Sequence, residues 1–346
     1  MNKTETLSPE QAARLHKDAI VIDGLSFYYD GPTPRLNPEL ITATNVTVAE
    51  TYNDFGAAVE EILTVRAALA RDPGARLVER AADIEQAKQD GVVGIIFGLQ
   101  ASLPIGTDLS RIGKLYDLGV RIIQLTYNDR TWTGDGCLEP VDGGLSRFGR
   151  EFIEELARVG VALDLSHVGR RTSLEAIAAS PKPPMFSHAN PAALTDNPRN
   201  LTDEQIKAIG ERGGLIGCCT WAPLCYKNRA GVQPTVDDFL DHVDYVVDLI
   251  GIDHVGIATD SACTANTAWV AQHSLEFNTA FPEIASGYYA HFSDRTGITQ
   301  PVGVEGGIAD LSPITQGLAR RGYREEDIRK VIGGNFLRHL REVWGS

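Results

Sequence analysis

Two histidines and an aspartate lie where the sequence could bind a metal ion or a substrate. His167 and His188 each follow a serine directly, in the segments LSH and FSH, and Asp260 ends the segment HVGIATD. Each of the three ends an apolar run typical of a buried strand. Neutral imidazole and carboxylate groups are ligands that zinc-like ions prefer. These side chains therefore predict a metal site or a substrate site.

The segment VIDGLSFYYD, residues 21–30, argues against metal ligands at the end of the first strand. Val21 and Ile22 are β-branched and begin a strand, and strands of this kind often end in a His-x-Asp pair of metal ligands. Here the strand ends at Leu25, Ser26 and Phe27. Leucine and phenylalanine carry no donor atom for a cation, so this strand end predicts an apolar surface where a metal could have been bound.

The elements that must position these residues form a regular series. Eight apolar runs alternate with amphipathic helical patterns, several of which begin at Asp or Thr and end at Gly. The runs cover residues 19–25, 40–49, 92–100, 120–127, 161–167, 183–190, 214–221 and 254–260. This alternation predicts a (β/α)₈ TIM barrel, with its active site at the carboxyl ends of the strands. A doubly wound open sheet is the alternative, but no G-x-G-x-x-G follows the first run.

Length and composition suit one barrel domain spanning residues 1–346. The chain is 43% hydrophobic and 23% charged, enough to bury a large core. Residues 261–309, rich in Gly, Ala, Ser and aromatic residues, predict a long loop or lid. The segment 324–344 predicts an amphipathic helix pair packed on the barrel wall. Three histidines in helical segments are expected at the surface: His16, His242 and His339.

Charge and targeting signals argue against several classes of partner. The formal net charge is -14, which disfavours a nucleic-acid surface because such a surface needs a basic patch. The amino-terminal residues lack the apolar region of a signal peptide, and no apolar run is long enough to span a bilayer. Five cysteines, an odd number, suggest free thiols in a reducing compartment. A cytoplasmic protein without a membrane or nucleic-acid partner is expected.

Several segments together resemble the membrane (renal) dipeptidase family. They are DLSHVGRR, SHANPAALTDNPRNLTDE, GIDHVGIATD and EDIRKVIGGNFLRHLREVW, and they occur in the family's order over most of the chain. The resemblance implies a zinc-dependent amidohydrolase on a (β/α)₈ barrel, usually a homodimer, that cleaves dipeptides. The membrane anchor of that family belongs only to some animal members, and no anchor signal is present here.

The resemblance also assigns roles to individual residues. The two histidine ligands of the family's second zinc fall on His167 and His188, and its aspartate at the end of the seventh strand falls on Asp260. The arginine that binds the substrate carboxylate falls on Arg199. The first zinc's His-x-Asp pair instead falls on Leu25 and Phe27. The glutamate that bridges both zincs falls on Gln100, and the substrate-side histidine falls on Tyr127.

These replacements predict one zinc or other divalent ion per chain, or none. Hard cations need charged oxygen donors, and the neutral amide of Gln100 cannot replace a bridging carboxylate. A one-metal site would use His167, His188 and Asp260, with water and the Gln100 oxygen completing it. Such an ion could lower the pKa of its water, with Asp260 as general base if it is not itself a ligand.

Aromatic residues gather near the expected mouth: Phe27, Tyr28, Tyr29, Tyr127 and Trp132. They either fill the space that the ions would occupy or form a box that attracts a small cation. With Arg199 opposite, Tyr127 and Gln100 would contact a small zwitterionic substrate, either a dipeptide or an amino-acid derivative.

The predicted function is hydrolysis of a C–N bond in such a substrate by a dipeptidase-like enzyme. Two alternatives stay open. One is an altered or inactive homologue that binds an amine or carboxylate ligand without cleaving it. The other is a metal-free enzyme of different chemistry that uses Tyr127 or Asp260 as acid or base.

Overall fold

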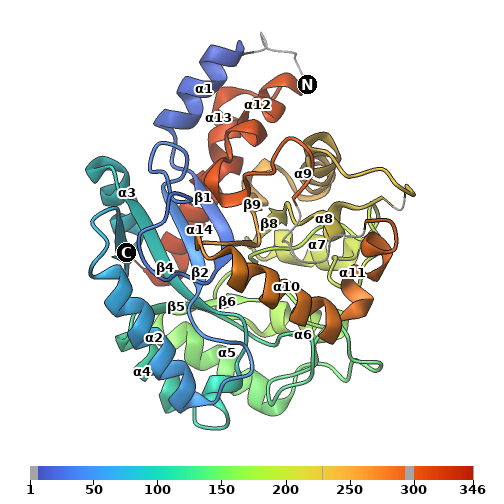
Figure 1. The fold of residues 1–346 in the computed structure, drawn as a ribbon. Coiled ribbons are helices and arrows are strands. Elements are labelled where there is room, and N and C mark those ends of the chain that lie inside the picture. The colour runs from blue at the N-terminus through green and yellow to red at the C-terminus, as the bar shows by residue number, and fades with distance from the viewer. Residues whose placement is uncertain (1–6, 228, 293–299, 346) are drawn as a thin grey trace.

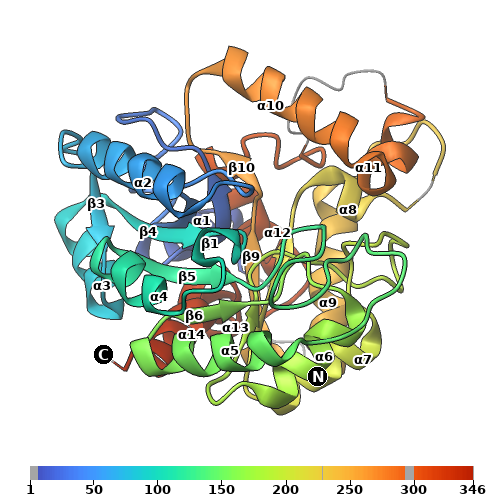
Figure 2. The ribbon, with the colours of Figure 1, turned by 90° about the horizontal axis from the view of Figure 1, so that it is seen from below.

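A closed ring of parallel strands forms the centre of the molecule (Figures 1 and 2). The structure is a computed structural model and describes residues 7–227, 229–292 and 300–345. Its barrel strands are β1 (Ile22–Phe27), β2 (Ala43–Thr47), β4 (Val93–Leu99), β5 (Val120–Gln124), β6 (Ala162–Asp164), β7 (Met185–Phe186), β8 (Leu215–Cys219) and β9 (Val255–Ala258). Each pairs with the next, and β9 pairs back with β1, so the predicted (β/α)₈ barrel is confirmed.

Each of the eight predicted runs overlaps one barrel strand, and β1 continues past its run to Phe27. Two short strands were not predicted: β3 (Ala75–Val78) pairs with β4 outside the ring, and β10 (Ser261–Ala262) extends β1. Helix α1 (Pro9–Asp18) precedes β1. Helices follow the strands as expected: α2 (Phe55–Leu69), α3 (Ala81–Asp90), α4 (Ser110–Asp117), α5 (Arg147–Val159), α6 (Arg170–Ala179), α7 (Asp203–Glu211), α8 (Ala222–Cys225), α9 (Val236–Ile250), α12 (Ser312–Arg320) and α13 (Glu325–Arg329). Among the described residues, no helix is both long and apolar enough to cross a bilayer.

The seam of the barrel lies between β1 and β9, where Asp23 is the backbone partner of Ile257. The buried Asp23 carboxylate accepts hydrogen bonds from Thr259 N at 2.7 Å and from Thr44 Oγ1 at 3.0 Å. Burial raises the Asp23 pKa to about 7, although these hydrogen bonds oppose the rise. One side chain therefore joins β1, β2 and the end of β9.

The amino-terminal end of the barrel is closed by α14 (Asn335–Trp344), which follows the π-helical turn η4 (Lys330–Gly334). Phe336, 2% exposed, packs with Ile22, Met185 and Leu215 at the starts of their strands. A Cβ atom at Gly256 would lie 2.4 Å from the Phe336 ring, so the absence of a side chain there makes room for it. The segment predicted to pack on the barrel wall thus also forms the barrel floor.

Most of the predicted loop or lid at 261–309 is helical. It contains α10 (Thr267–Ala280), α11 (Pro282–Tyr289) and the short 3₁₀ helix η3 (Gly307–Ala309), whereas residues 293–299 lie outside the described part. Figures 1 and 2 show α10 and α11 on the same side of the barrel as α8. Movement as a lid stays a prediction.

The expectation that three helical histidines lie at the surface is wrong. His16, His242 and His339 are each at most 1% exposed. They lie on the buried faces of α1, α9 and α14, among the buried apolar residues of the same helices. His16 Nδ1 is hydrogen-bonded to Thr315 Oγ1 at 2.7 Å, which satisfies one buried ring nitrogen.

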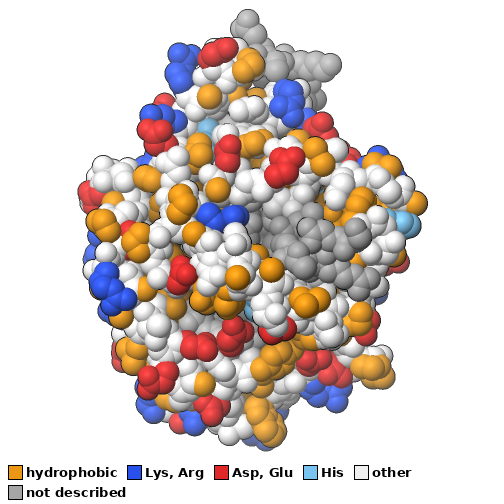
Figure 3. Space-filling model, in the orientation of Figure 1, with side chains coloured by type: hydrophobic (Ala, Val, Ile, Leu, Met, Phe, Trp, Pro, Cys, Tyr) orange, Lys and Arg blue, Asp and Glu red, His pale blue; other side chains and the backbone are white. Residues whose placement is uncertain are grey.

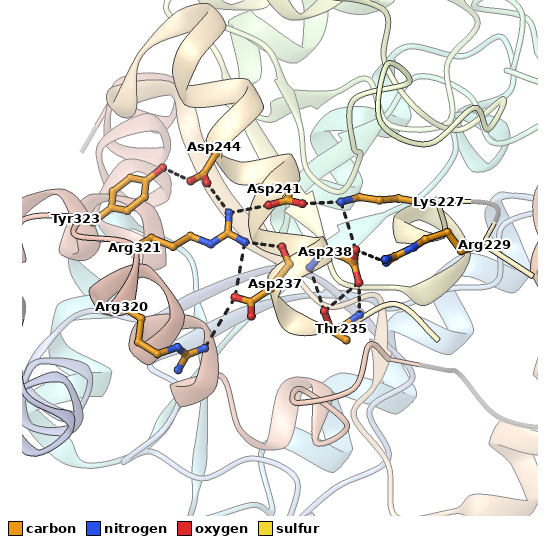
Figure 4. Close-up of polar contacts among 10 residues, drawn as sticks. All are labelled: Lys227, Arg229, Thr235, Asp237, Asp238, Asp241, Asp244, Arg320, Arg321 and Tyr323. Atoms are coloured by element: carbon orange, nitrogen blue, oxygen red, sulfur yellow. Dashed lines mark hydrogen bonds and ion pairs between the residues drawn. The ribbon is translucent and has the colours of Figure 1, made fainter. Parts of the chain in front are cut away.

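Charged side chains on the outside pair with one another. On the face shown in Figure 3, acidic and basic side chains are interspersed among apolar ones. Figure 4 shows one network in which the acidic side chains of α9 meet basic side chains from α12, from its end and from the segment before α9. Arg321 Nη1 lies 2.8 Å from Asp241, and Lys227 Nζ lies 3.2 Å from Asp238. These pairs fasten α9 to its neighbours.

We predict that Phe336→Ala lowers the free energy of unfolding by about 3–5 kcal/mol, because it removes a buried ring and leaves a cavity in the barrel floor. Trp132→Ala is the control, since Trp132 is 63% exposed and its loss should cost little. Urea denaturation followed by circular dichroism measures both. Equal stabilities of the two variants would show that the floor does not depend on this ring.

Candidate active site

The predicted site residues follow different strands but meet at one end of the barrel. Gln100 directly follows β4, Tyr127 follows β5, His167 follows β6, His188 follows β7 and Asp260 follows β9. Arg199 comes from the loop after β7. A cavity of about 720 Å³ is lined by Gln100, Tyr127, His167, Arg199 and Asp260. His188 is completely buried and contacts His167 from behind. The barrel thus brings all six residues together.

The two histidines have neutral rings whose Nε2 atoms face each other. Their Nε2 atoms lie 3.0 Å apart, His167 Nδ1 lies 2.7 Å from Asn128 Oδ1, and His188 Nδ1 lies 2.7 Å from Ser187 Oγ. Ser187 Oγ in turn donates to Asp164 at 2.5 Å. Burial and the nearby Arg199 charge hold the pKa of each ring well below its ordinary value. This chain of contacts fixes the orientation of both rings.

A metal site of the family's kind does not fit these residues. The Nε2 atoms of His167 and His188 are close enough to share an ion, but no group of three or more His, Cys, Asp or Glu side chains among the described residues could hold one. Asp260 therefore does not complete the predicted ligand set. Gln100 turns its amide nitrogen to His188 Nε2 at 3.4 Å, while its oxygen accepts a hydrogen bond from Thr47 Oγ1 at 3.0 Å. The expected oxygen ligand is thus already engaged.

Asp260 contributes a carboxylate to the cavity. Its backbone is left-handed, with φ of 50°, and its N–H donates to Leu25 O at 2.9 Å across the seam. Its side chain is only partly exposed and accepts no hydrogen bond from the described residues. Burial raises its pKa to about 6, and the positive charge of Arg199 limits the rise. A carboxylate with this pKa can exchange a proton near neutral pH.

Arg199 and Tyr127 provide the cation and a hydroxyl donor. Arg199 is buried and donates through Nη2 to His188 O at 3.1 Å, which leaves other N–H groups of the guanidinium for a ligand. The Tyr127 ring stacks on His167 with centroids 4.1 Å apart. Burial first, and then the charge of Asp260, raises the Tyr127 pKa well above its usual value. The phenol is therefore protonated and can donate a hydrogen bond into the cavity.

The aromatic residues mostly pack on one another. Tyr28 stacks on Trp269 at 3.7 Å, and Trp269 stacks on His273 at 4.5 Å, so both faces of the indole are covered. Tyr29 is buried and donates its hydroxyl to Asp72 at 2.5 Å. Trp132, expected at the mouth, is largely exposed and is not among the residues that line the cavity. Mutual filling of space is the interpretation that these contacts favour over a cation box.

Helix α10 contributes a wall that the sequence interpretation mostly missed. Trp269, His273 and Phe277 follow one another at intervals of four residues and all line the cavity. The i, i+4, i+8 spacing of these rings was the available signal, since it places them on one face of a helix.

Comparison with known proteins identifies the family. The sequence model of membrane dipeptidase, Peptidase family M19, matches residues 7–286. The chain belongs to this family. It is a hydrolase of the family's peptide-bond-cleaving type, as predicted.

Two similar proteins and one similar fold illustrate the relationship. An amidohydrolase of known structure from Pseudomonas aeruginosa is 34% identical, with a TM-score of 0.83, and the match covers 98% of this chain and 100% of that one. Dipeptidase verJ of Clonostachys rogersoniana is 28% identical over 309 residues, which are 88% of this chain and 70% of verJ. The probable dipeptidase PvdM of Pseudomonas aeruginosa shares the fold, at 20% identity, a TM-score of 0.77 and coverage of 97% and 98%.

We predict that the purified chain binds at most one divalent ion, at His167 and His188. The combined replacement Leu25→His, Phe27→Asp and Gln100→Glu should raise the number of bound ions, because it returns three donor groups to the mouth. Elemental analysis after dialysis against zinc measures both proteins. Two ions in the unaltered chain would contradict the prediction, and no increase in the triple variant would show that the pocket has changed beyond its ligands.

Proposed function

We propose that this enzyme hydrolyses the C–N bond of a small zwitterionic substrate, a dipeptide or an amino-acid derivative, with Asp260 as its base. The observation that carries the proposal is the Asp260 carboxylate, which accepts no hydrogen bond from the described residues and shares one cavity with the Arg199 guanidinium and the Tyr127 hydroxyl. Few side chains are better suited to accept a proton near neutral pH than a carboxylate with a pKa of about 6.

The first step is binding of the substrate carboxylate by Arg199. The guanidinium can form two parallel hydrogen bonds with a carboxylate, and its position beneath the cavity directs the rest of the substrate towards Asp260 and Tyr127. Holding the substrate at one charged end in this way limits the orientations of the scissile bond.

The chemical steps then need one base and one donor. Asp260 removes a proton from a water molecule, and the water oxygen forms a bond to the carbonyl carbon. Tyr127 donates a hydrogen bond to the developing oxyanion, an interaction that strengthens as negative charge accumulates. The protonated Asp260 returns the proton to the amide nitrogen as the C–N bond breaks, which releases the amine and the carboxylic acid.

The family's zinc chemistry would polarise the carbonyl and activate water, but the residues present do not fit the two-ion site that supplies it. The proposed steps therefore use only side chains of this chain. Assembly as a homodimer and a cytoplasmic location stay predictions from the sequence.

One observation favours the alternative of a binding protein without catalysis. Gln100, Leu25 and Phe27 replace three groups that the resemblance assigns to metal binding, while Arg199, which would hold a carboxylate ligand, is retained. A chain of this kind would bind the zwitterion and not cleave it.

We expect Asp260→Asn to lower kcat/KM at least 100-fold, because an amide cannot accept the proton of water. In the unaltered enzyme, kcat/KM should fall as the pH drops through about 6, where Asp260 becomes protonated. The measurement is a pH–rate profile on a panel of dipeptides. Rapid cleavage by Asp260→Asn would contradict the assignment of the base, and absence of cleavage of every substrate by the unaltered enzyme would favour the binding alternative.

For Arg199, we expect Arg199→Lys to weaken binding of carboxylate ligands about tenfold, because lysine loses the two-pronged contact but keeps the charge. The melting temperature should change little. Calorimetric titration with a dipeptide and with its C-terminal amide separates the effects, since the amide should bind both proteins equally. A large loss of stability with unchanged affinity would instead assign Arg199 a structural role.

A further inference from the structure

The cavity continues past the site residues to a wall that carries acidic side chains. Glu50 follows β2, Glu61 lies on α2 and Glu276 lies on α10, and all three line the same cavity as Arg199 and Asp260. We call these three residues the acidic wall. Its members come from three separate elements, so they meet only because the barrel and α10 bring them together.

No basic side chain neutralises the acidic wall. Glu61 accepts a hydrogen bond from Glu50 N at 2.7 Å, and Glu276 accepts one from Gln272 Nε2 at 2.6 Å. In the part of the chain that the structure describes, no ion pair reaches any of the three carboxylates. Arg71 also lines the cavity but forms no ion pair with them. Three carboxylates therefore face the cavity without an ion-pair partner among the described residues, although Arg71 and His273 line the same cavity.

Elsewhere the protein compensates clustered carboxylates. Figure 4 shows that Asp238, Asp241 and Asp244, which are close together on α9, pair with Lys227, Arg229 and Arg321. The acidic wall differs because none of its three carboxylates forms an ion pair with a basic side chain among the described residues. Three carboxylates on one wall of a cavity give it a negative potential that attracts a cation.

A second observation on the same cavity also indicates a missing ligand. Ser274 of α10 lines the cavity and is only 6% exposed, yet its Oγ has no hydrogen-bond partner among the described residues. Buried hydroxyl groups are nearly always paired, because leaving one unpaired costs free energy. A polar group that enters the cavity beside α10 would satisfy it.

The acidic wall and the catalytic groups come from different elements. Glu50, Glu61 and Glu276 come from the segment after β2, from α2 and from α10, whereas Arg199 and Asp260 follow β7 and β9. Burial raises the Glu50 pKa, the charges of Glu61 and Glu276 raise it further, and the charge of His273 opposes the rise. A ligand that reaches both groups must extend along the cavity that they share.

We propose that the acidic wall binds a basic side chain on the residue that precedes the scissile bond, so that the preferred substrates are dipeptides beginning with lysine or arginine. This inference rests on the proposed function, in which Arg199 holds the carboxylate of the second residue. The first residue then points away from Arg199. Its α-amino group lies next to the scissile carbonyl, and only a long side chain extends from there to the wall. Because the aromatic faces are already stacked, a cation that donates hydrogen bonds fits better than a quaternary amine.

The test compares Lys-Ala with norleucyl-Ala, which has a side chain of similar length without the charge. Affinities are measured by calorimetry in the Asp260→Asn background, so that binding is followed without turnover. Lys-Ala should bind about tenfold or more tightly than norleucyl-Ala at low salt, and this preference should disappear in Glu50→Gln/Glu276→Gln. Glu60→Gln is the matched control, because Glu60 is exposed on α2 and is not among the cavity-lining residues.

The outcomes separate this inference from the proposed function. Equal affinities for the two dipeptides, or a preference that survives loss of both carboxylates, would overturn the basic-side-chain site. Cleavage of Lys-Ala by the Asp260-containing enzyme is measured separately. If Lys-Ala binds selectively but is never cleaved, the acidic wall stands as a binding site and the hydrolytic mechanism fails.

Discussion

The active end of this barrel depends on how the ring of strands closes. Asp23 joins β1 to Thr44 of β2 and to Thr259 at the end of β9, and Asp260 is the next residue after Thr259. The backbone of Asp260 then donates to Leu25 O on the same seam. The buried hydrogen bonds of one carboxylate therefore set the position of another, and the left-handed turn at Asp260 directs its side chain into the cavity.

The replaced ligand positions make physical sense as a group. If the chain had kept carboxylates at positions 27 and 100 without bound cations, it would bury unpaired negative charges at a large free-energy cost. Phe27 and the neutral Gln100 avoid that cost. Gln100 also donates towards His188 and accepts from Thr47, so the amide takes part in the local hydrogen bonding. The two retained histidines stay neutral, and their Nδ1 atoms are hydrogen-bonded to Asn128 and Ser187.

The sequence predicted the barrel well because buried parallel strands have a clear signature. Each of the eight apolar runs overlaps a barrel strand, and the residues that end those runs meet at the mouth because parallel strands share one carboxyl edge. The pattern of apolar runs does not predict the direction in which an individual side chain points. The Gln100 amide is oriented by Thr47, a contact between neighbouring strands, and Trp132 lies in a loop whose path no periodicity reveals. The helical histidines were misplaced because a polar residue on an inner helix face looks like a surface residue in sequence.

The floor of the barrel has a consequence for the order of folding. The ring of strands is complete by residue 258, whereas the ring that fills its base belongs to residue 336. During synthesis all eight strands would leave the ribosome before α14. A barrel assembled at that stage would have an unfilled apolar cavity at its base. Such a species is prone to aggregation, so the protein would rely on rapid arrival of α14 or on a chaperone while it is being made.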